Sequence, residues 1–261
     1  MGRANKSALG SSKSNSSSSG TSKKSKRSAA SDSRPGAAKP RSAAATIEWP
    51  AVKPKKGLQL AELVSGHIFL IRNLLSKQEC DAFIRLADDL CVPTPGVPKR
   101  GEAFRNNARW SGIDTQFAQA LWTDSGMGRL LGGWTHPDGR EPVGLLENIR
   151  LYRYGPGQRF GKHYDDYFFD PKGRRTEYTL LIYLNAVDDE RFGAEKGGRS
   201  SGGETVFYAG RMQPVSVKPE MGLALLHKHG ADCLQHEALE IQNSYKYVLR
   251  SDLVFDRAGN E

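Results

Sequence analysis

The sequence predicts a mostly β domain with flanking helices, of the α+β class, that follows a disordered N-terminal tail. Strand-like apolar runs and apolar residues at helical spacing predict the domain. The composition of the first residues predicts the tail. We expect the tail and a linker over residues 1–57 and one domain over residues 58–257. About 200 residues is an ordinary size for one domain with a single core.

The strand candidates combine β-type patterns with turn signals at their ends. Residues 149–154 alternate apolar and basic side chains, as expected for a half-exposed strand, and Gly155-Pro156-Gly157 then marks a turn. Residues 178–185 read as a buried strand, and the other candidates are shorter or mixed runs of strand-forming residues. The candidates are residues 67–71, 149–154, 178–185, 202–207 and 246–255.

Two helices are expected before the main group of strands. Ser76-Lys77-Gln78-Glu79 is a capping box, which starts a helix by satisfying its first backbone N–H groups. Apolar residues then recur at helical spacing up to Leu90. A second helix is predicted over residues 114–131, with Phe117 and Leu121 on its buried side. We expect these helices to support one face of the β-structure.

The basic character of the chain belongs to its N-terminal end. Residues 1–46 hold ten of the 38 Lys and Arg residues and one of the 29 acidic residues, so the remainder has 28 of each. This segment is rich in Ser, Ala, Gly and Lys and cannot bury a core. Its basic cluster at residues 23–27 fits a nuclear-import signal, a weak nucleic-acid contact or a solvated spacer, and all three remain open.

Cysteine usage and hydropathy bear on the compartment. The N-terminal residues lack the apolar core of a signal peptide. The most apolar stretch, residues 63–75, is interrupted by polar side chains and is too short to span a bilayer. Three cysteines, Cys80, Cys91 and Cys233, give no disulfide framework and suit a reducing compartment. We expect a cytoplasmic or nuclear location and no membrane association.

A possible metal site is the most informative pattern in the chain. His163 and Asp165 are two residues apart, so in an extended segment both side chains leave the same face. With His236 they form a set of two imidazoles and one carboxylate. That facial triad is typical of non-haem Fe(II) oxygenases, which need open positions on the metal. Lys246, ten residues after His236, supplies a cation that could hold a dicarboxylate co-substrate.

The choice of the third ligand has alternatives, because His227 and His229 lie near His236 in sequence. On a strand, His227 and His229 would share one face and imitate a metal site. Lys228-His229-Gly230 is more typical of a turn, and only His236 stands ten residues before a lysine. We therefore expect His236 to be the ligand and the other two histidines to have structural or supporting roles.

Four sequence runs together resemble a known family. YRYGPGQRFGKHYD, LLIYLN, GGETVF and QHEALEIQNSYKYVLRSDLVF look like the catalytic domain of prolyl 4-hydroxylase-type Fe(II)/2-oxoglutarate dioxygenases. The resemblance covers about residues 66–256, with the motifs in the family's order. It implies a double-stranded β-helix, which is a jelly-roll core of two antiparallel sheets.

The resemblance also assigns roles to residues. His163, Asp165 and His236 match the catalytic metal ligands, and Lys246 matches the basic residue that pairs with the distal carboxylate of 2-oxoglutarate. Two tyrosines fall where the family often places hydroxyls toward the co-substrate, although they also fit as ordinary strand aromatics. Arg250 shares the strand face of Lys246, so it could add positive charge to the co-substrate pocket or pair with an acid of the barrel. The two tyrosines are Tyr154 and Tyr183.

The implied activity is hydroxylation of prolyl residues in a protein or peptide, with release of succinate and CO2. Fe(II), 2-oxoglutarate as co-substrate and ascorbate as reductant are implied with it. The same chemistry on a nucleobase or small molecule is the main alternative, and a non-catalytic jelly-roll binding module is another. A lysine at position 246 argues against the nucleic-acid demethylases, which carry arginine there. We expect residues 93–109 and 188–203 to read the substrate.

Overall fold

The computed structural model describes residues 47–94, 96–98, 100–194, 202–210 and 213–256. The chain from Ile47 onward forms one compact unit. The predicted disorder of residues 1–46 thus lies outside the described residues. The compact domain begins at Ile47 and not at residue 58 as expected.

Tertiary contacts explain this earlier start of the domain. Trp49 stacks on Phe117 with ring centroids 3.9 Å apart, and its indole N–H donates to Asp114 over 2.7 Å. Lys55 pairs with Glu79 at 2.7 Å. The predicted linker is therefore part of the folded domain.

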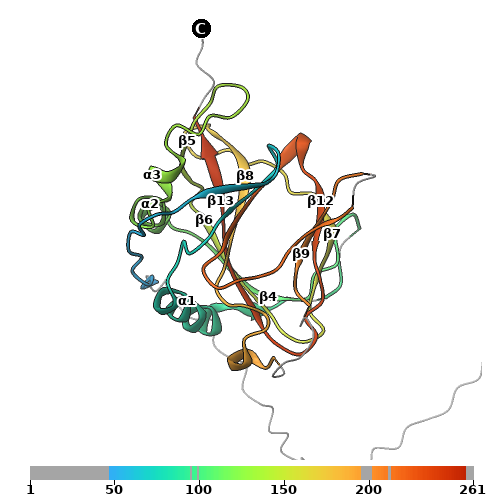
Figure 1. Cartoon of the computed structure of the whole chain (residues 1–261). Coiled ribbons are helices and arrows are strands. Elements are labelled where there is room, and N and C mark those ends of the chain that lie inside the picture. Colours follow the sequence, from blue (N-terminus) through green and yellow to red (C-terminus); the bar gives the residue numbers. More distant parts are fainter. Residues whose placement is uncertain (1–46, 95, 99, 195–201, 211–212, 257–261) are drawn as a thin grey trace, which may run out of the picture. The chain divides into compact units, whose positions relative to one another are not determined.

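Two antiparallel sheets form the centre of the domain (Figure 1). The larger sheet contains β1 (Leu60–Val64), β2 (Ile68–Ile71), β3 (Val92–Pro93), β4 (Ala108–Ile113), β5 (Pro142–Leu145), β6 (Asn148–Tyr154), β8 (Arg175–Tyr183), β11 (Ala224–Lys228) and β13 (Lys246–Phe255). Its order is β1-β2-β11-β8-β13-β6-β4-β3, with β5 also paired to β13. The smaller sheet has the order β10-β9-β12-β7 and contains β7 (Phe160–His163), β9 (Thr205–Tyr208), β10 (Val215–Val217) and β12 (Gln235–Ala238).

Three α-helices lie on the side of the larger sheet that faces away from the smaller sheet (Figure 1). They are α1 (Lys77–Leu90), α2 (Thr115–Asp124) and α3 (Met127–Leu131). The predicted capping box is present, because the Ser76 hydroxyl accepts from the Glu79 N–H and the Glu79 carboxylate accepts from the Ser76 N–H. This arrangement confirms the predicted mostly β, jelly-roll fold with flanking helices.

The second predicted helix, residues 114–131, is divided in two. Asp114 caps α2 by accepting from the Phe117 N–H at 2.8 Å. The chain then reaches Gly126, whose φ of 85° is left-handed and ends the α-helical path. Glycine adopts this conformation at little cost, so the break lies where the sequence permits it.

Strand β13 separates two interiors of the domain. Leu249 and Leu253 pack into the hydrophobic cluster that includes the helices, whereas Val248 joins the cluster between the two sheets. Because strand side chains alternate, Lys246 and Arg250 share the face of Val248. Two charged residues thus face the space between the sheets.

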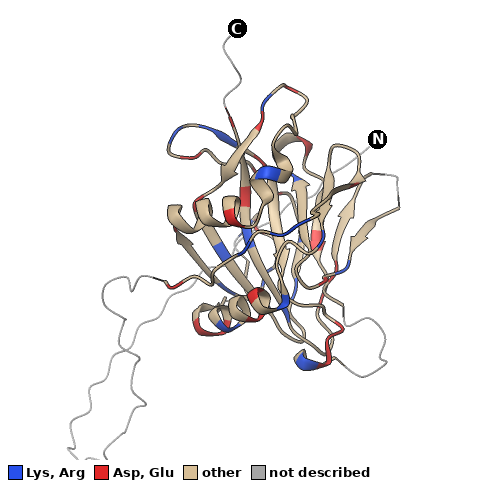
Figure 2. Cartoon of the chain, turned by 60° about the vertical axis from the view of Figure 1, so that its left-hand side comes forward, with Lys and Arg blue, Asp and Glu red and all other residues tan. Residues whose placement is uncertain are grey.

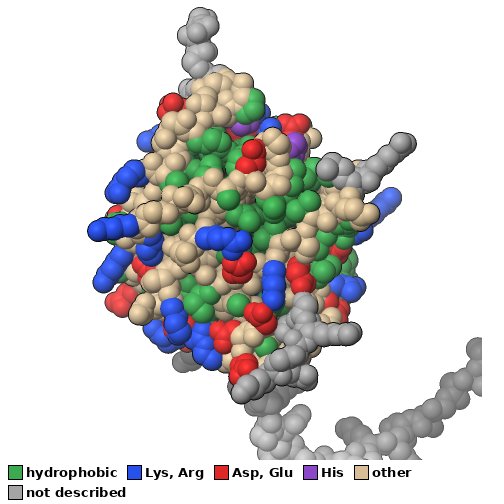
Figure 3. All heavy atoms as spheres, in the orientation of Figure 1, with side chains coloured by type: hydrophobic (Ala, Val, Ile, Leu, Met, Phe, Trp, Pro, Cys, Tyr) green, Lys and Arg blue, Asp and Glu red, His purple; other side chains and the backbone are tan. Residues whose placement is uncertain are grey.

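The exterior carries both signs of charge. Lys/Arg and Asp/Glu residues are interspersed along the ribbon in Figure 2, and on the face in Figure 3 they surround a hydrophobic area. Among the described residues, no helix combines the length and apolarity that crossing a membrane requires. Short 3-10 turns at Glu190–Phe192 and Gly230–Asp232 complete the described elements.

Candidate metal and co-substrate site

The three predicted ligands come together between the sheets. His163 ends β7 and is the direct register partner of His236 on β12, with ring centroids 4.2 Å apart. Asp165 follows two residues after the end of β7. Its carboxylate lies 3.6 Å from His163 Nε2 and 3.8 Å from His236 Nε2. One ligand atom from each of the three residues lies within 4.8 Å of the others.

Hydrogen bonds orient both imidazoles for metal binding. Nδ1 of His163 lies 2.9 Å from the Gly161 carbonyl, and Nδ1 of His236 lies 2.9 Å from the Leu234 carbonyl. A carbonyl only accepts, so Nδ1 carries the proton in each ring and Nε2 keeps a free lone pair. Burial lowers the pKa of His163 to about 4 and also lowers that of His236. Both rings are therefore neutral at pH 7, as metal binding requires.

Asp165 is held as a carboxylate by its neighbours. Burial alone would raise its pKa, but the Arg250 guanidinium beside it brings the pKa well below its ordinary value. Arg250 lies 3.0 Å from the carboxylate, and the Thr179 hydroxyl donates to it at 2.8 Å. Two neutral imidazoles and an ionised carboxylate fit the donor set that Fe(II) takes in facial triads.

His229 supports this arrangement from behind Thr179. Its Nδ1 lies 3.1 Å from the Thr179 hydroxyl, which itself donates to Asp165. The contact agrees with the supporting role expected for His229.

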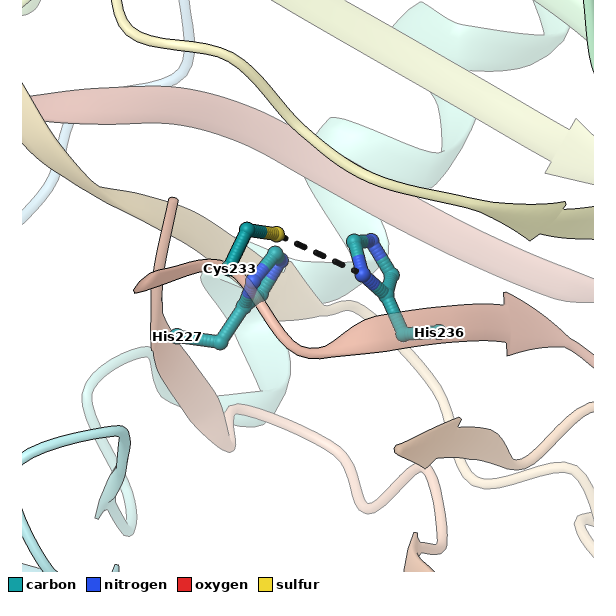
Figure 4. A group of neighbouring side chains, drawn as sticks. All are labelled: His227, Cys233 and His236. Carbon is teal, nitrogen blue, oxygen red and sulfur yellow. Dashed lines mark hydrogen bonds between the residues drawn. The ribbon is translucent and has the colours of Figure 1, made fainter. Parts of the chain in front are cut away.

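A second group of possible ligands, His227, Cys233 and His236, lies beside the first (Figure 4). The His236 nitrogen that faces the Cys233 sulfur, at 4.0 Å, is Nδ1. That nitrogen already donates to the Leu234 carbonyl. Burial also raises the pKa of the Cys233 thiol to about 11, so the sulfur stays protonated at pH 7. The donor chemistry therefore favours the triad with Asp165.

Lys246 lies at the start of β13 and is 2% exposed. Its ammonium donates to the Gly203 carbonyl at 2.6 Å and lies 5.4 Å and 5.3 Å from the ring centroids of Tyr154 and Tyr183. Burial lowers the Lys246 pKa to about 7, against the opposing effect of Glu204. A cation in such a place is costly unless an anion joins it.

Glycine at position 203 allows this contact. Its φ is 79°, and a Cβ there would lie 2.3 Å from the Ile241 Cδ1. A side chain there would require Ile241 to move and would be strained by the left-handed φ.

One cavity contains Lys246 and the triad together. It is lined by Lys246, the three ligand candidates, Tyr154, Thr205, His227 and Arg250 among others. Lys246 and Arg250 are four residues apart on β13, which is roughly 13 Å along a strand. Since Arg250 contacts Asp165, the cavity extends from the metal ligands toward a buried ammonium. A short dicarboxylate that binds both ends would follow this direction, and the lining side chains would have to move to admit it, because the cavity measures about 30 Å³.

The other predicted site residues have defined surroundings. Tyr154 lines the cavity, and the Tyr183 hydroxyl donates to the Thr205 hydroxyl at 2.8 Å. Arg250 lines the cavity as well. Its guanidinium contacts the Asp165 carboxylate and lies 3.4 Å from the Asp252 carboxylate. Its proximity to both acids makes pairing with a barrel acid its clearest contact. A direct role of Arg250 toward the co-substrate stays a prediction.

Two residues of the site were not predicted from the sequence. Thr179 bonds to Asp165, and Asp252 pairs with Arg250 and Arg150. Asp252 had a usable signal, because it follows Arg250 by two residues on the inward face of β13. Thr179 is its register partner on β8, and that pairing is visible only in the folded sheet.

Comparisons with known proteins agree with this geometry. Residues 149–251 match the family model described as 2OG-Fe(II) oxygenase superfamily. The chain is 28% identical over 194 residues to probable prolyl 4-hydroxylase 3 of Arabidopsis thaliana, covering 66% of this chain and 62% of that protein. It is 29% identical over 181 residues to probable prolyl 4-hydroxylase 7 of the same plant, covering 61% and 51%. The chain thus spans less than two thirds of the length of these relatives.

A solved structure shares the fold. A Trichoplax adhaerens prolyl hydroxylase, in complex with a hypoxia inducible factor oxygen degradation domain peptide fragment, superposes with a TM-score of 0.52 at 18% identity. The match covers 73% of this chain and 84% of that one.

Proposed function

We propose that the chain is a member of the 2OG-Fe(II) oxygenase superfamily and a dioxygenase of the prolyl 4-hydroxylase type. Its substrate would be prolyl residues of a protein or peptide. The proposal rests on one observation: His163, Asp165 and His236 line the same cavity as the buried Lys246. A binding module has no use for a charged lysine buried opposite three metal ligands.

Nε2 of His163, Nε2 of His236 and the Asp165 carboxylate would hold Fe(II). When bound, Fe(II) with 2-oxoglutarate and dioxygen supplies the oxidation of a C–H bond, and succinate and CO2 are released. The protein's own part is to hold the ligands in their binding forms. Arg250 and Thr179 do so by fixing an ionised Asp165.

Lys246 would neutralise the distal carboxylate of 2-oxoglutarate. The contact is strong because the lysine is buried, where charge-assisted hydrogen bonds are less weakened by water. Tyr154 would contribute its hydroxyl along the cavity, and Tyr183 would orient Thr205, which also lines it. A bound dianion would favour the charged lysine and raise its pKa.

The finer parts of the proposal concern reductant, compartment and partners. Ascorbate would serve as reductant. A cytoplasmic or nuclear location is supported by three free, buried cysteines. The N-terminal basic residues would make at most a weak nucleic-acid contact.

The test supplies purified protein with Fe(II), 2-oxoglutarate and proline-containing peptides. Succinate release and a peptide mass increase of one oxygen atom are expected together. His236→Ala should abolish both, whereas His67→Ala, which changes a histidine on the β1–β2 turn, should not. Hydroxylation of oligonucleotides but not of peptides would contradict the proposed substrate. Iron binding without succinate release from any substrate would contradict the enzymatic function.

A further inference from the structure

A second cavity beside the metal ligands is lined by four arginines. It measures about 250 Å³ and is bordered by Arg105, Arg109, Arg150 and Arg250. Asp165 borders this arginine cavity as well as the co-substrate cavity. A group bound among the arginines would therefore lie next to the metal site.

This concentration of positive charge is local. Outside residues 1–46 the chain has equal numbers of basic and acidic residues. Three of the arginines come from neighbouring strands, and Arg150 and Arg250 are direct register partners on β6 and β13. Arg105 precedes β4 and bridges to Phe160. Like charges placed opposite each other destabilise a sheet. The arrangement therefore needs compensating anions.

Protein carboxylates compensate two of the four arginines. Asp252 lies 3.0 Å from Arg150 and 3.4 Å from Arg250, and Asp165 lies 3.0 Å from Arg250. Arg105 and Arg109 form no ion pair with any residue in the described part of the chain. The Arg105 guanidinium instead lies 3.6 Å above the Phe160 ring. Two cationic groups at this cavity thus remain for an external anion.

The guanidinium fork matches a carboxylate, because two parallel N–H groups can bond to its two oxygens. A cleft lined by one sign of charge also concentrates ligands of the opposite sign. The cavity is small, which fits one side chain better than a nucleic-acid backbone. On these grounds, and resting on the proposed function, we propose that the arginine cavity binds an Asp or Glu side chain near the target proline. The substrate would then be an acidic peptide segment.

The experiment uses the full chain with Fe(II), 2-oxoglutarate and proline peptides that differ only at flanking positions. Each position is occupied in turn by Glu, by uncharged Gln or by Lys, and kcat/KM for succinate release is measured. At one or more positions Glu should exceed Gln by about tenfold, the effect of one charge-assisted pair. Added salt should reduce that ratio.

Variants connect the preference to the cavity. Arg109 is exposed, so Arg109→Glu should fold normally and should reverse the preference toward Lys peptides. Arg105→Gln should weaken the preference for Glu, giving a second, independent variant. Arg85→Glu makes the same charge change on α1, outside the cavity, and should retain the full preference.

The outcomes separate this inference from the proposed function. Hydroxylation of Glu, Gln and Lys peptides at equal rates would overturn the acidic preference and leave the proposed activity intact. If the preference for Glu peptides persisted in both Arg109→Glu and Arg105→Gln, the arginine cavity would not be its origin. Inhibition by an oligonucleotide that exceeds inhibition by a Glu peptide would assign the arginines to nucleic acid. Turnover of no peptide at all would reject both proposals.

Discussion

Replacing Lys246 with Met tests the co-substrate assignment and predicts two opposite effects. Met keeps an unbranched apolar chain in a position that is 2% exposed, but removes the ammonium. In the folded protein burial lowers the Lys246 pKa to about 7, from an ordinary value of 10.5. The unfolded chain therefore binds more protons between these pH values, and the free energy of unfolding rises with pH across that window. Below pH 7 the buried lysine lowers the free energy of unfolding by its full amount.

The size of both effects follows from this burial. The pKa difference corresponds to a destabilisation on the order of 4 kcal/mol at pH 7. Lys246→Met should thus raise the free energy of unfolding at pH 7, as measured by urea denaturation. The distal carboxylate of 2-oxoglutarate would lose its partner in a buried place, which costs about 3–5 kcal/mol. The dissociation constant for 2-oxoglutarate should rise about a hundredfold or more.

The binding assay is anaerobic calorimetric titration of the Fe(II) protein with 2-oxoglutarate. Fe(II) affinity should change little, because Lys246 contacts no metal ligand candidate in the structure. Lys246→Arg should be milder than Lys246→Met but not neutral, since the guanidinium is longer and forked. Lys218→Met changes a half-exposed surface lysine paired with Asp188 and serves as the control.

One result would refute the reasoning. If Lys246→Met bound 2-oxoglutarate as tightly as the unchanged protein, the lysine would not hold the distal carboxylate. The role would then pass to Arg250, whose substitution should weaken co-substrate binding. Because Arg250 also contacts Asp165, that variant should lose metal affinity as well. The two assignments are thus distinguishable by the metal titration.

Four further predictions concern the same domain. His236→Ala should abolish Co(II) binding, while circular dichroism shows that the fold is retained. Cys233→Ser should leave the Co(II) affinity and the absorption spectrum of bound Co(II) unchanged. If Cys233→Ser removed a sulfur-to-metal absorption band, the ligand group with Cys233 would be favoured. His227→Phe should raise the free energy of unfolding by about 1–2 kcal/mol, since neither buried ring nitrogen has a hydrogen-bond partner among the described residues, and a lower melting temperature would contradict this. Deleting residues 1–46 should leave kcat/KM on a short peptide unchanged. The affinity of the free protein for 2-oxoglutarate should fall as pH rises above about 7, where Lys246 loses its proton, and a flat pH profile would contradict that role.

Local patterns predicted β6, β8, β9 and β13 at the site, but not β12, which carries His236. The predicted last strand, residues 246–255, coincides with β13. The strand predicted at 178–185 is shifted to Arg175–Tyr183, since its polar first residues are held by pairing with β13. β1 was not predicted, because its exposed side chains give little hydrophobic signal.

Tertiary contacts decided what the sequence left open. The separate roles of His229 and His236 depend on which strand pairs with which. β12 pairs with β7, which brings His236 beside His163, while β11 pairs with β8, which places His229 beside Thr179. Likewise the packing of Trp49 against Phe117 extends the domain into a segment whose composition resembles a linker. Neither pairing has a local signature.

The charges on the inner face of β13 differ in how they are compensated, and the difference separates structural from functional residues. Arg250 and Asp252 lie close to each other and to Asp165 or Arg150, so their charges stabilise a fixed metal ligand. Lys246 instead donates to the neutral carbonyl of Gly203, and burial lowers its pKa. A buried charge that weakens the fold is retained most readily where an anionic ligand needs it. The same strand therefore carries a rigid end at the metal and an anion-binding end at Lys246.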